Sequence, residues 1–311
     1  MTTMKAIRIH SYGGPEVLVY EDAPIPDPGS GEVLIRVRAA GVNPIDWKIR
    51  AGYMSAFLNL AFPFILGIDV AGEVESVGSD VTDFKPGDPV YAWADFSRNG
   101  SYAEYVTVAA ANVAPKPESL SFVEAAAVPQ AGLTAWQALF ETGGLQPGQT
   151  VFIHAAAGGV GTFAVQLAKW HGARVYGTAS NGNLEFLRDI GVDEPLDYAT
   201  LNSADIAQSV DLVVDAVGGE TLDRSWTILK PGGMLVGMVA PPSEETANTH
   251  GVRSAFHMTH GSGQQLREIA AMIDAGHVRP VVQTVLPLAE TRRAHEMSQT
   301  GRGRGKIILE V

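Results

Sequence analysis

The clearest functional motif in the sequence is a glycine-rich turn. Residues 156–161 read Ala-Ala-Gly-Gly-Val-Gly, which fits the pattern G-x-G-x-x-G with alanine in the first position. Glycine at Gly158 lets the backbone approach a pyrophosphate, and glycine at Gly161 lets the next helix pack closely on the preceding strand. The N–H groups and the dipole at the start of that helix attract phosphate. Because an apolar strand precedes the turn and a helical pattern follows it, a dinucleotide site is favoured over a purely structural turn.

A second signal lies about 20 residues beyond the glycines, where folds that prefer NAD carry Asp or Glu for the ribose 2′-OH. Here this position falls on or beside Ser180, within Gly177–Asn183, and no carboxylate is near it in sequence. Ser180 and Asn181 can donate hydrogen bonds to a 2′-phosphate, which favours NADP(H). The turn holds no Arg or Lys, so the preference need not be strong, and both residues can also cap the following helix.

The first part of the chain must position any catalytic side chains, and up to about residue 115 its pattern is that of strands. Alternating segments such as Glu32–Arg38 and Gly72–Gly78 are typical of half-buried strands, and Lys85–Asp88 is typical of a turn. We expect a twisted β-barrel with few helices here.

The middle of the chain alternates between strands and helices. Ser121 and Glu124 form a capping box, and the apolar strand Thr150–Ala155 leads through the glycine turn into the helical pattern Val160–Trp170. Helical segments separate the further predicted strands, which are Arg174–Thr178, Asp211–Asp215 and Met234–Val239. This alternation predicts a parallel, doubly wound sheet.

The last part of the chain returns to the first pattern after about Gln283. A strand at Thr284–Leu286 and a helix at Leu288–Ser298 precede a final strand at Lys306–Val311. That final strand could complete the first domain.

Composition excludes several function classes. Apolar residues make up 46% of the chain and charged residues 18%, as in a folded, core-rich protein. The 34 acidic and 22 basic residues give a net charge of −12, which argues against nucleic acid or anionic membrane as a partner. Cysteine is absent, which excludes disulfides and cysteine-based zinc sites. Residues 1–10 lack the pattern of a targeting peptide, and no apolar run is long enough for a membrane helix, so we expect a cytoplasmic protein.

Six segments together carry a family resemblance: Ala40–Lys48, Gly67–Gly72, Gly100–Tyr105, Ala131–Ala135, Ala155–Gly161 and Gly305–Leu309. On these segments nearly the whole chain resembles the zinc-free, quinone-oxidoreductase-like branch of the medium-chain dehydrogenase/reductases. The resemblance implies an α/β protein in which a GroES-like β-barrel catalytic domain is joined to a doubly wound, parallel-sheet Rossmann domain, usually as a homodimer. We place residues 1–124 and 266–311 in the catalytic domain and 125–265 in the Rossmann domain.

The resemblance also indicates that a metal site is missing. Zinc-dependent relatives carry a Cys near Asn43, a His before an acidic residue at the place of Ile68–Asp69, and a third ligand near Gln130. Ile45 stands where a hydroxyl would relay a proton from an alcohol. Neither Ile nor Asn can replace a thiolate or an imidazole, so no metal is expected. Without one, oxidation of an unactivated alcohol has no evident means of stabilising the alkoxide.

Reduction of an already polarised acceptor does not need the metal, because the resulting enolate or quinol oxygen needs only hydrogen-bond donors. The resemblance places Asn43 and Lys48 against the nicotinamide ribose and the substrate oxygen, with Asp46 orienting them. Tyr53 is the fourth catalytic candidate. It would line an apolar slot with Phe57, Trp93 and Tyr102, although Trp47, Phe57 and Tyr102 also suit the barrel core.

Further cofactor contacts follow from the resemblance alone. Thr134 would touch the nicotinamide ribose, and Tyr198 the 2′-phosphate end of the adenosine. The remaining candidates are Ala157, Gly158, Gly159 and Val160 at the pyrophosphate, Val217 at the adenine, Val239 at the nicotinamide and Lys306, which would reach the cofactor from the last strand.

These observations predict an NADPH-dependent reductase of quinones or α,β-unsaturated carbonyl compounds. Two alternatives stay open, a reductase of simple aldehydes or ketones and a protein that binds NADPH without turnover.

Overall fold

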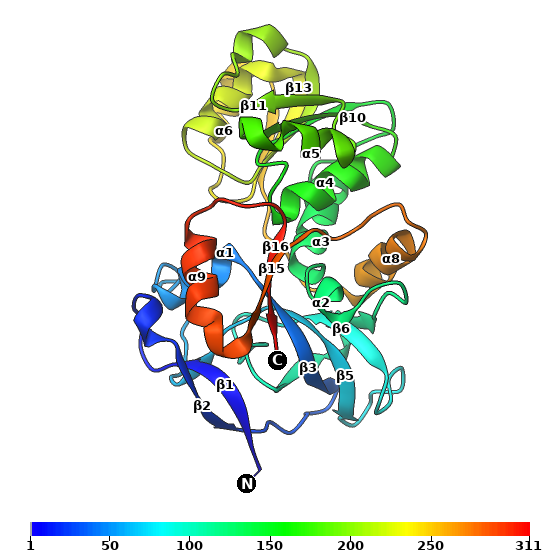
Figure 1. Cartoon of the computed structure of the whole chain (residues 1–311). Helices are drawn as coiled ribbons and strands as arrows, with labels where there is room; N and C mark the ends of the chain where they lie inside the picture. Colours follow the sequence, from blue (N-terminus) through cyan, green and yellow to red (C-terminus); the bar gives the residue numbers. More distant parts are fainter. Residues whose placement is uncertain (1) are drawn as a thin grey trace. The chain divides into compact units, whose positions relative to one another are not determined.

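The computed structural model describes residues 2–311, which form two compact units (Figure 1). Unit 1 contains the chain up to Gln130 together with Gly261–Gly276 and Pro280–Val311, and unit 2 contains Ala131–His260 and His277–Arg279. The domain boundaries expected from sequence, 124/125 and 265/266, lie a few residues from the boundaries of these units. Both termini of the chain therefore contribute to the same unit.

Unit 2 is built on one six-stranded sheet in which every strand pair is parallel. The strands in spatial order are β11 (Glu194–Asp197), β10 (Arg174–Ala179), β9 (Thr150–Ile153), β12 (Val210–Asp215), β13 (Leu229–Gly237) and β14 (Arg253–Phe256). The order runs outward from β9 in both directions, so the sheet is doubly wound. The α/β fold class expected from the alternating pattern is confirmed.

The helices of unit 2 pack on this sheet in two groups. Helices α4 (Gly159–Trp170) and α5 (Leu184–Asp189) contact strands β9 to β11. Helices α6 (Glu220–Ser225) and α7 (Glu244–His250) contact strands β12 to β14. Right-handed crossovers then place the two groups on opposite faces. The order reverses between β9 and β12, and in such sheets ligands bind at the carboxyl ends of the strands beside that point.

Two strands of unit 2 differ from their predicted bounds by more than one residue. Strand β9 ends at Ile153, two residues early, because the chain turns sharply and Ala155 adopts φ +51°, a left-handed conformation that is rare outside glycine. Strand β13 begins at Leu229, where Met234 was predicted. Helix α3 (Pro129–Trp136) enters unit 2 and continues as a π-helical turn over Gln137–Thr142.

Unit 1 contains two sheets, as expected for the barrel. The smaller sheet has the order β2 (Val19–Pro24), β1 (Thr3–Ile9) and β4 (Phe64–Ile65). The larger one has the order β15 (Val282–Pro287), β16 (Lys306–Glu310), β3 (Glu32–Val42), β5 (Asp69–Val77), β6 (Pro89–Trp93) and β8 (Val113–Pro115), with β7 (Tyr105–Ala109) also paired to β3. Apolar side chains such as Ile35, Val70 and Val90 are fully buried in its core.

The end of the chain completes unit 1 as expected, because β16 pairs antiparallel with β3. The helices of this unit are α1 (Pro44–Arg50), α2 (Phe122–Ala125), α8 (Gly263–Asp274) and α9 (Thr291–Gln299). The capping box predicted for Ser121 and Glu124 is present at the start of α2. Helix α9 begins three residues later than predicted, after a 3₁₀ turn over Leu288–Glu290. Within residues 2–311, the structure contains no helix with the length and apolarity that a bilayer crossing requires.

Candidate active site

The loop that carries the catalytic candidates is positioned by the junction of β3 and α1. Strand β3 ends at Val42, Asn43 is the N-cap, and Pro44 occupies the first helical position, where its missing N–H costs nothing. The carboxylate of Asp46, three residues into the helix, accepts a hydrogen bond from the Asn43 backbone N–H at 2.7 Å. Local sequence therefore determines the shape of this loop.

A buried ion pair lies against Asn43. Asp69 at the start of β5 is fully buried, and its Oδ2 accepts hydrogen bonds from Asn43 Nδ2 at 2.9 Å and Lys306 Nζ at 2.9 Å. The Lys306 ammonium, on a residue only 5% exposed, also donates to Asn43 Oδ1. We call Asn43, Asp69 and Lys306 the buried polar cluster. The family resemblance implied that Lys306 reaches the cofactor, and its contact with Asp69 was not expected from sequence.

Strand register brings the buried polar cluster together. Gly41 of β3 pairs with Asp69 of β5, and Val42 pairs with Ile307, next to Lys306. A Cβ atom at Gly41 would lie 2.5 Å from both Ala126 O and Asp69 Oδ2, so only glycine leaves room for the carboxylate. A carboxylate within the apolar run 64–71 was the available signal, because such a group needs a buried partner.

The backbone N–H of Gln130 donates to Asp69 Oδ1. Asp69 therefore links the three positions at which zinc-dependent relatives would hold a metal.

Asp46 has a second buried partner. The Tyr102 hydroxyl donates to Asp46 Oδ2 at 2.8 Å, and neither side chain is exposed. Burial raises the pKa of Asp46 to about 7, although the hydrogen bonds from Asn43 N–H and Tyr102 lower it. Within residues 2–311, Asp46 Oδ1 has no hydrogen-bond partner. Tyr102 is therefore part of the barrel core, one of the two roles expected for it, and does not line a substrate slot.

Aromatic side chains follow α1 on the surface of unit 1. Lys48 is half-buried, and its Nζ lies 5.8 Å from the centre of the Trp47 ring. Tyr53 is 69% exposed and meets the same ring edge-on at a centroid distance of 6.0 Å. Phe57 is 81% exposed, which excludes it from the core. Lys48, Tyr53 and Phe57 are therefore accessible to an apolar ligand.

The glycine turn of unit 2 has the geometry that a pyrophosphate requires. Gly158 is the N-cap of α4 and provides no capping side chain, so the first N–H groups of the helix, which include those of Gly159 and Val160, are available to a ligand. A Cβ atom at Gly161 would lie 2.7 Å from Ala156 Cα and closer still to the Ala155 carbonyl oxygen. The close approach of helix and strand therefore requires glycine. Ala157 is buried beside this turn.

Ser180 and Tyr198 lie at the same edge of the sheet. Ala179 pairs with Asp197, so the next residues, Ser180 and Tyr198, both follow carboxyl ends of adjacent strands, and the Tyr198 N–H donates to Ala179 O at 3.2 Å. Asn181 follows Ser180 on the surface. The pairing also brings the carboxylate of Asp197 to this edge, which sequence distance concealed; one of its oxygens accepts the Ala199 N–H.

Two of the remaining cofactor candidates in unit 2 also follow carboxyl ends of strands, and the third lies in helix α3. Val217 follows β12 and Val239 follows β13, and both are more than two-fifths exposed. A Cβ at Gly218, next to Val217, would lie 3.5 Å from Val239, so the two loops are neighbours. Thr134 in α3 shares a 2.7 Å hydrogen bond with Thr259.

Comparison with known proteins finds related families and relatives that together cover both units. The family described as alcohol dehydrogenase GroES-like domain matches residues 29–118, and the one described as zinc-binding dehydrogenase matches residues 190–309. The mitochondrial NAD(P)H oxidoreductase RTN4IP1 of Danio rerio is 37% identical over 355 residues, covering 100% of this chain and 92% of that protein. The 2-methylene-furan-3-one reductase of Solanum lycopersicum is 37% identical over 321 residues, covering 98% and 79%.

Several solved structures superpose closely on this chain. The quinone oxidoreductase from Coxiella burnetii superposes with a TM-score of 0.92 at 36% identity and full coverage of both chains. This chain belongs to the zinc-free, quinone oxidoreductase branch of the medium-chain dehydrogenase/reductases. Mycobacterial Rv1454c in complex with NADPH superposes with a TM-score of 0.89 at 32% identity, covering 99% and 100%. NAD(P)H oxidoreductase activity and a nicotinamide cofactor follow for this member of the branch.

The donor set of this quinone oxidoreductase-branch chain does not fit the metal that the second family description implies. Asn43 Oδ1 and Asp69 Oδ2 both accept hydrogen bonds from the Lys306 ammonium, so a cation already occupies the place between them. Across residues 2–311, no three His, Cys, Asp or Glu side chains are grouped as metal ligands. We derive no step through a metal.

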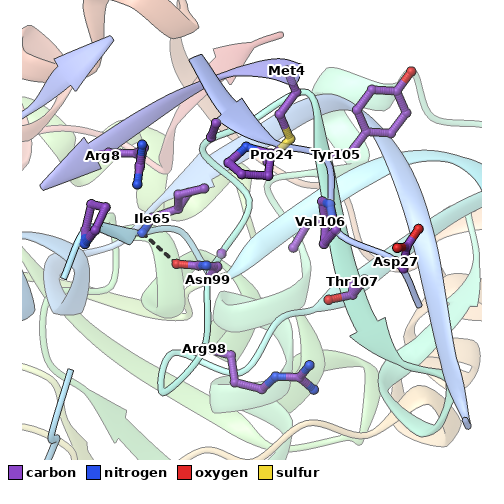
Figure 2. Close-up of a pocket in the computed structure, with 14 residues that line it drawn as sticks. Met4, Arg8, Pro24, Asp27, Ile65, Arg98, Asn99, Tyr105, Val106 and Thr107 are labelled. Atoms are coloured by element: carbon purple, nitrogen blue, oxygen red, sulfur yellow. Dashed lines mark hydrogen bonds between the residues drawn. The ribbon is translucent and has the colours of Figure 1, made fainter. Parts of the chain in front are cut away.

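A separate cavity of about 360 Å³ lies in unit 1, and none of the site candidates lines it. Figure 2 shows Arg8 and Arg98 on its wall, with Asn99 Oδ1 accepting the Ile65 N–H at 3.0 Å. Arg8 is paired with Glu21 and Arg98 with Glu32. The guanidinium charges of this cavity are therefore already balanced within the protein.

Proposed function

We propose that the chain is a zinc-independent, NADPH-dependent reductase that transfers hydride to quinones or α,β-unsaturated carbonyl compounds. The observation that carries the proposal is the buried polar cluster, in which the Lys306 ammonium binds Asn43 and Asp69 where a metal would otherwise lie. An acceptor that is already polarised needs fixed hydrogen-bond donors rather than a Lewis acid. The names of the Coxiella quinone oxidoreductase and of the tomato reductase, whose substrate is an α,β-unsaturated ketone, support both acceptor classes.

The residues of unit 1 would act on the oxygen of the acceptor. Bound NADPH supplies the hydride. The Asn43 amide and the Lys48 ammonium are the donors that would stabilise negative charge as it grows on the acceptor oxygen, and solvent can supply the final proton. Asp46 is fully buried, so it would act by holding the Asn43 backbone N–H rather than by touching the acceptor. Tyr53 would contact the apolar body of the acceptor.

The residues of unit 2 would hold the cofactor. The N-terminus of α4 suits the pyrophosphate, and the exposed Ser180, Asn181 and Tyr198 suit the 2′-phosphate. Asp197 at the same edge limits the preference for NADPH, because a carboxylate repels the added phosphate. The NADPH complex of the mycobacterial relative supports the choice of cofactor.

Steady-state NADPH oxidation with a panel of quinones, enones and simple aldehydes tests the proposal. We expect turnover with quinones and enones, unchanged after prolonged chelation, and no stoichiometric zinc in the purified protein. Turnover confined to simple aldehydes or ketones would refute the proposed acceptors and make the chain a reductase of simple carbonyl compounds. NADPH binding without any turnover would make the chain a binding protein, and restoration of activity by zinc after chelation would refute metal independence.

The variant Lys48→Ala separates catalysis from cofactor anchoring. We expect a higher KM for NADPH and a smaller fall in kcat, because we propose that Lys48 chiefly holds the nicotinamide ribose. A fall in kcat on the order of 10²–10³ with unchanged KM would instead make Lys48 the main donor to the acceptor oxygen. Lys85→Ala, at an exposed turn, is the matched control. Unchanged constants in folded Lys48→Ala would exclude both roles.

The homodimer and the cytoplasmic location stay predictions. Gel filtration with light scattering and imaging of the tagged full-length chain would test them.

A further inference from the structure

We propose that Lys306 is a positioning residue of the reductase, in which a side-chain ammonium takes over the organising role of a metal ion and orients the Asn43 amide toward the acceptor oxygen. The inference rests on the proposed function and extends it to the last strand of the chain. Lys306 would act through Asn43 and would not itself need to touch the acceptor or the cofactor.

The charge balance of the buried polar cluster supports this role. The Asp69 carboxylate is fully buried, and a buried carboxylate needs a compensating partner. Of the ion pairs formed within residues 2–311, only Lys306–Asp69 has both side chains no more than 5% exposed. Lys306 therefore supplies positive charge at a place that water and salt hardly reach.

The orientation of the Asn43 amide also supports this role. Lysine only donates hydrogen bonds and a carboxylate only accepts them, so Lys306 must face Asn43 Oδ1 and Asp69 must face Asn43 Nδ2. The amide can then adopt only one of its two flipped arrangements. Its nitrogen carries a second hydrogen for which residues 2–311 provide no acceptor. We assign this second hydrogen to the acceptor oxygen.

The rigid anchoring of the Lys306 ammonium also supports this role. The Lys306 backbone N–H donates to Val281 O at 2.9 Å, and its neighbour Ile307 pairs with Val42, which immediately precedes Asn43. The ammonium is thus anchored to the same pair of strands as the amide that it orients. Donors held in this way need no rearrangement when charge develops on the acceptor.

A kinetic double-mutant cycle with Asn43→Ala, Lys306→Met and the double variant tests the proposal, with a quinone acceptor. We expect Asn43→Ala to lower kcat by about 10²-fold, as for loss of one donor to a developing oxyanion. Lys306→Met should lower kcat about tenfold or more with little change in the KM for NADPH. The double variant should be no slower than Asn43→Ala, because Lys306 acts only through Asn43.

A measurement independent of turnover follows the amide itself. In the ¹⁵N-labelled protein, the side-chain NH₂ signals of Asn43, identified by their loss in Asn43→Ala, should shift in Lys306→Met. They should not shift in Lys230→Met, a control that removes the half-exposed ion pair with Asp211 in unit 2. If Lys306→Met does not fold, Lys306→Gln combined with Asp69→Asn removes both charges while keeping hydrogen-bonding groups, and the same outcomes apply to it.

Several results would overturn the inference. They are an unchanged kcat in folded Lys306→Met, additive effects in the cycle, a change confined to the KM for NADPH, and unshifted Asn43 signals. The third result would show that Lys306 contacts the cofactor directly. A wild-type protein without turnover toward any acceptor would overturn the proposed function and this inference together, whereas an active wild type with any of the four results would overturn this inference alone.

Discussion

The candidate residues of unit 1 and those of unit 2 depend on different physical principles. In unit 1, the buried polar cluster joins charged and polar side chains from the junction of β3 and α1, from β5 and from β16. Asn43 and Lys306 are 263 residues apart. In unit 2, the glycine turn that we propose for the pyrophosphate, and call the phosphate turn below, is one continuous segment. It offers backbone N–H groups and has no side chains at Gly158 and Gly161. The residues of unit 1 depend on charge balance away from water, and those of unit 2 on backbone shape.

This difference determines how each set of candidate residues should fail. Removal of one partner from a buried charge cluster leaves the other charge uncompensated, so the free energy of unfolding falls as well as the activity. A change in the phosphate turn or at the ribose edge leaves most of the fold intact and alters cofactor affinity. Four substitutions compare the two modes of failure.

The largest effect is expected for Asp69→Ala in unit 1. The variant strands the Lys306 ammonium in the core, and breaking a buried pair in this way costs about 3–5 kcal/mol of unfolding free energy. Urea unfolding at neutral pH measures it. Glu220→Ala is the control, because its pair with Arg224 is exposed on α6 and is worth only about 0.3–0.5 kcal/mol. Equal losses of unfolding free energy in the two variants would show that burial of the Asp69–Lys306 pair does not increase the cost of breaking it.

Asp46→Asn should change the pH dependence of stability. Burial raises the folded-state pKa of Asp46 to about 7, above the unfolded value of about 3.9. The folded state therefore keeps a proton that the unfolded state has lost, and the unfolding free energy falls by roughly 1.4 kcal/mol per pH unit between about pH 5 and 7.

Asparagine does not titrate. The unfolding free energy of the wild type minus that of Asp46→Asn, measured by urea unfolding at a series of pH values, should therefore decline with that slope. Buried histidines whose pKa is lowered, His154, His257 and His295, are present in both proteins and cancel. Parallel curves for the two proteins would mean that Asp46 is ionised throughout this range.

Gly161→Ala tests the backbone shape of unit 2. The new Cβ would meet backbone atoms of Ala155 and Ala156, so α4 must move, at a cost of about 1–3 kcal/mol. We expect a higher KM for NADPH together with this loss. Gly182→Ala, where a Cβ meets nothing within 4 Å, is the control in the same unit. A Gly161→Ala protein with wild-type stability and KM would refute the close approach.

Ser180→Asp should have the smallest energetic effect. A carboxylate beside the 2′-phosphate should raise the KM for NADPH about tenfold, equivalent to 1.4 kcal/mol, and leave the KM for NADH nearly unchanged. The asparagine of Ser180→Asn has nearly the shape of the aspartate of Ser180→Asp but no charge. It should alter neither the KM for NADPH nor the KM for NADH by more than about twofold. If both variants use NADPH as well as the wild type does, Ser180 does not lie at the phosphate.

Much of the fold was predictable because its signals are local. The strand and helix at the glycine turn and the capping box at Ser121 each follow from residues close together in sequence. The return of the last strand to unit 1 was expected from the family resemblance instead. The structure differed mainly at element ends, as at Ala155, where a left-handed conformation ends β9 early. Propensity alone does not reveal such a turn at a residue other than glycine.

The side-chain partners could not be predicted in the same way. Tyr102 suited either a substrate slot or the barrel core. It is buried and bound to Asp46, and the isolated bridge between Ala6 and Ala103 places its segment against β1. Asp197 reaches the edge that carries Ser180 only through the pairing of β10 with β11. In both cases a strand register, rather than the residue type, decides the neighbour.

The fold class, the glycine turn and the absence of the family's usual zinc ligands were accessible from residue types, short spacings and the family resemblance. The contacts of Lys306 with Asp69 and Asn43 appear only in the folded structure. The physical reason is that a buried charge is stable only beside a compensating partner, and that partner is brought into place by the pairing of β16 with β3 across almost the whole length of the chain.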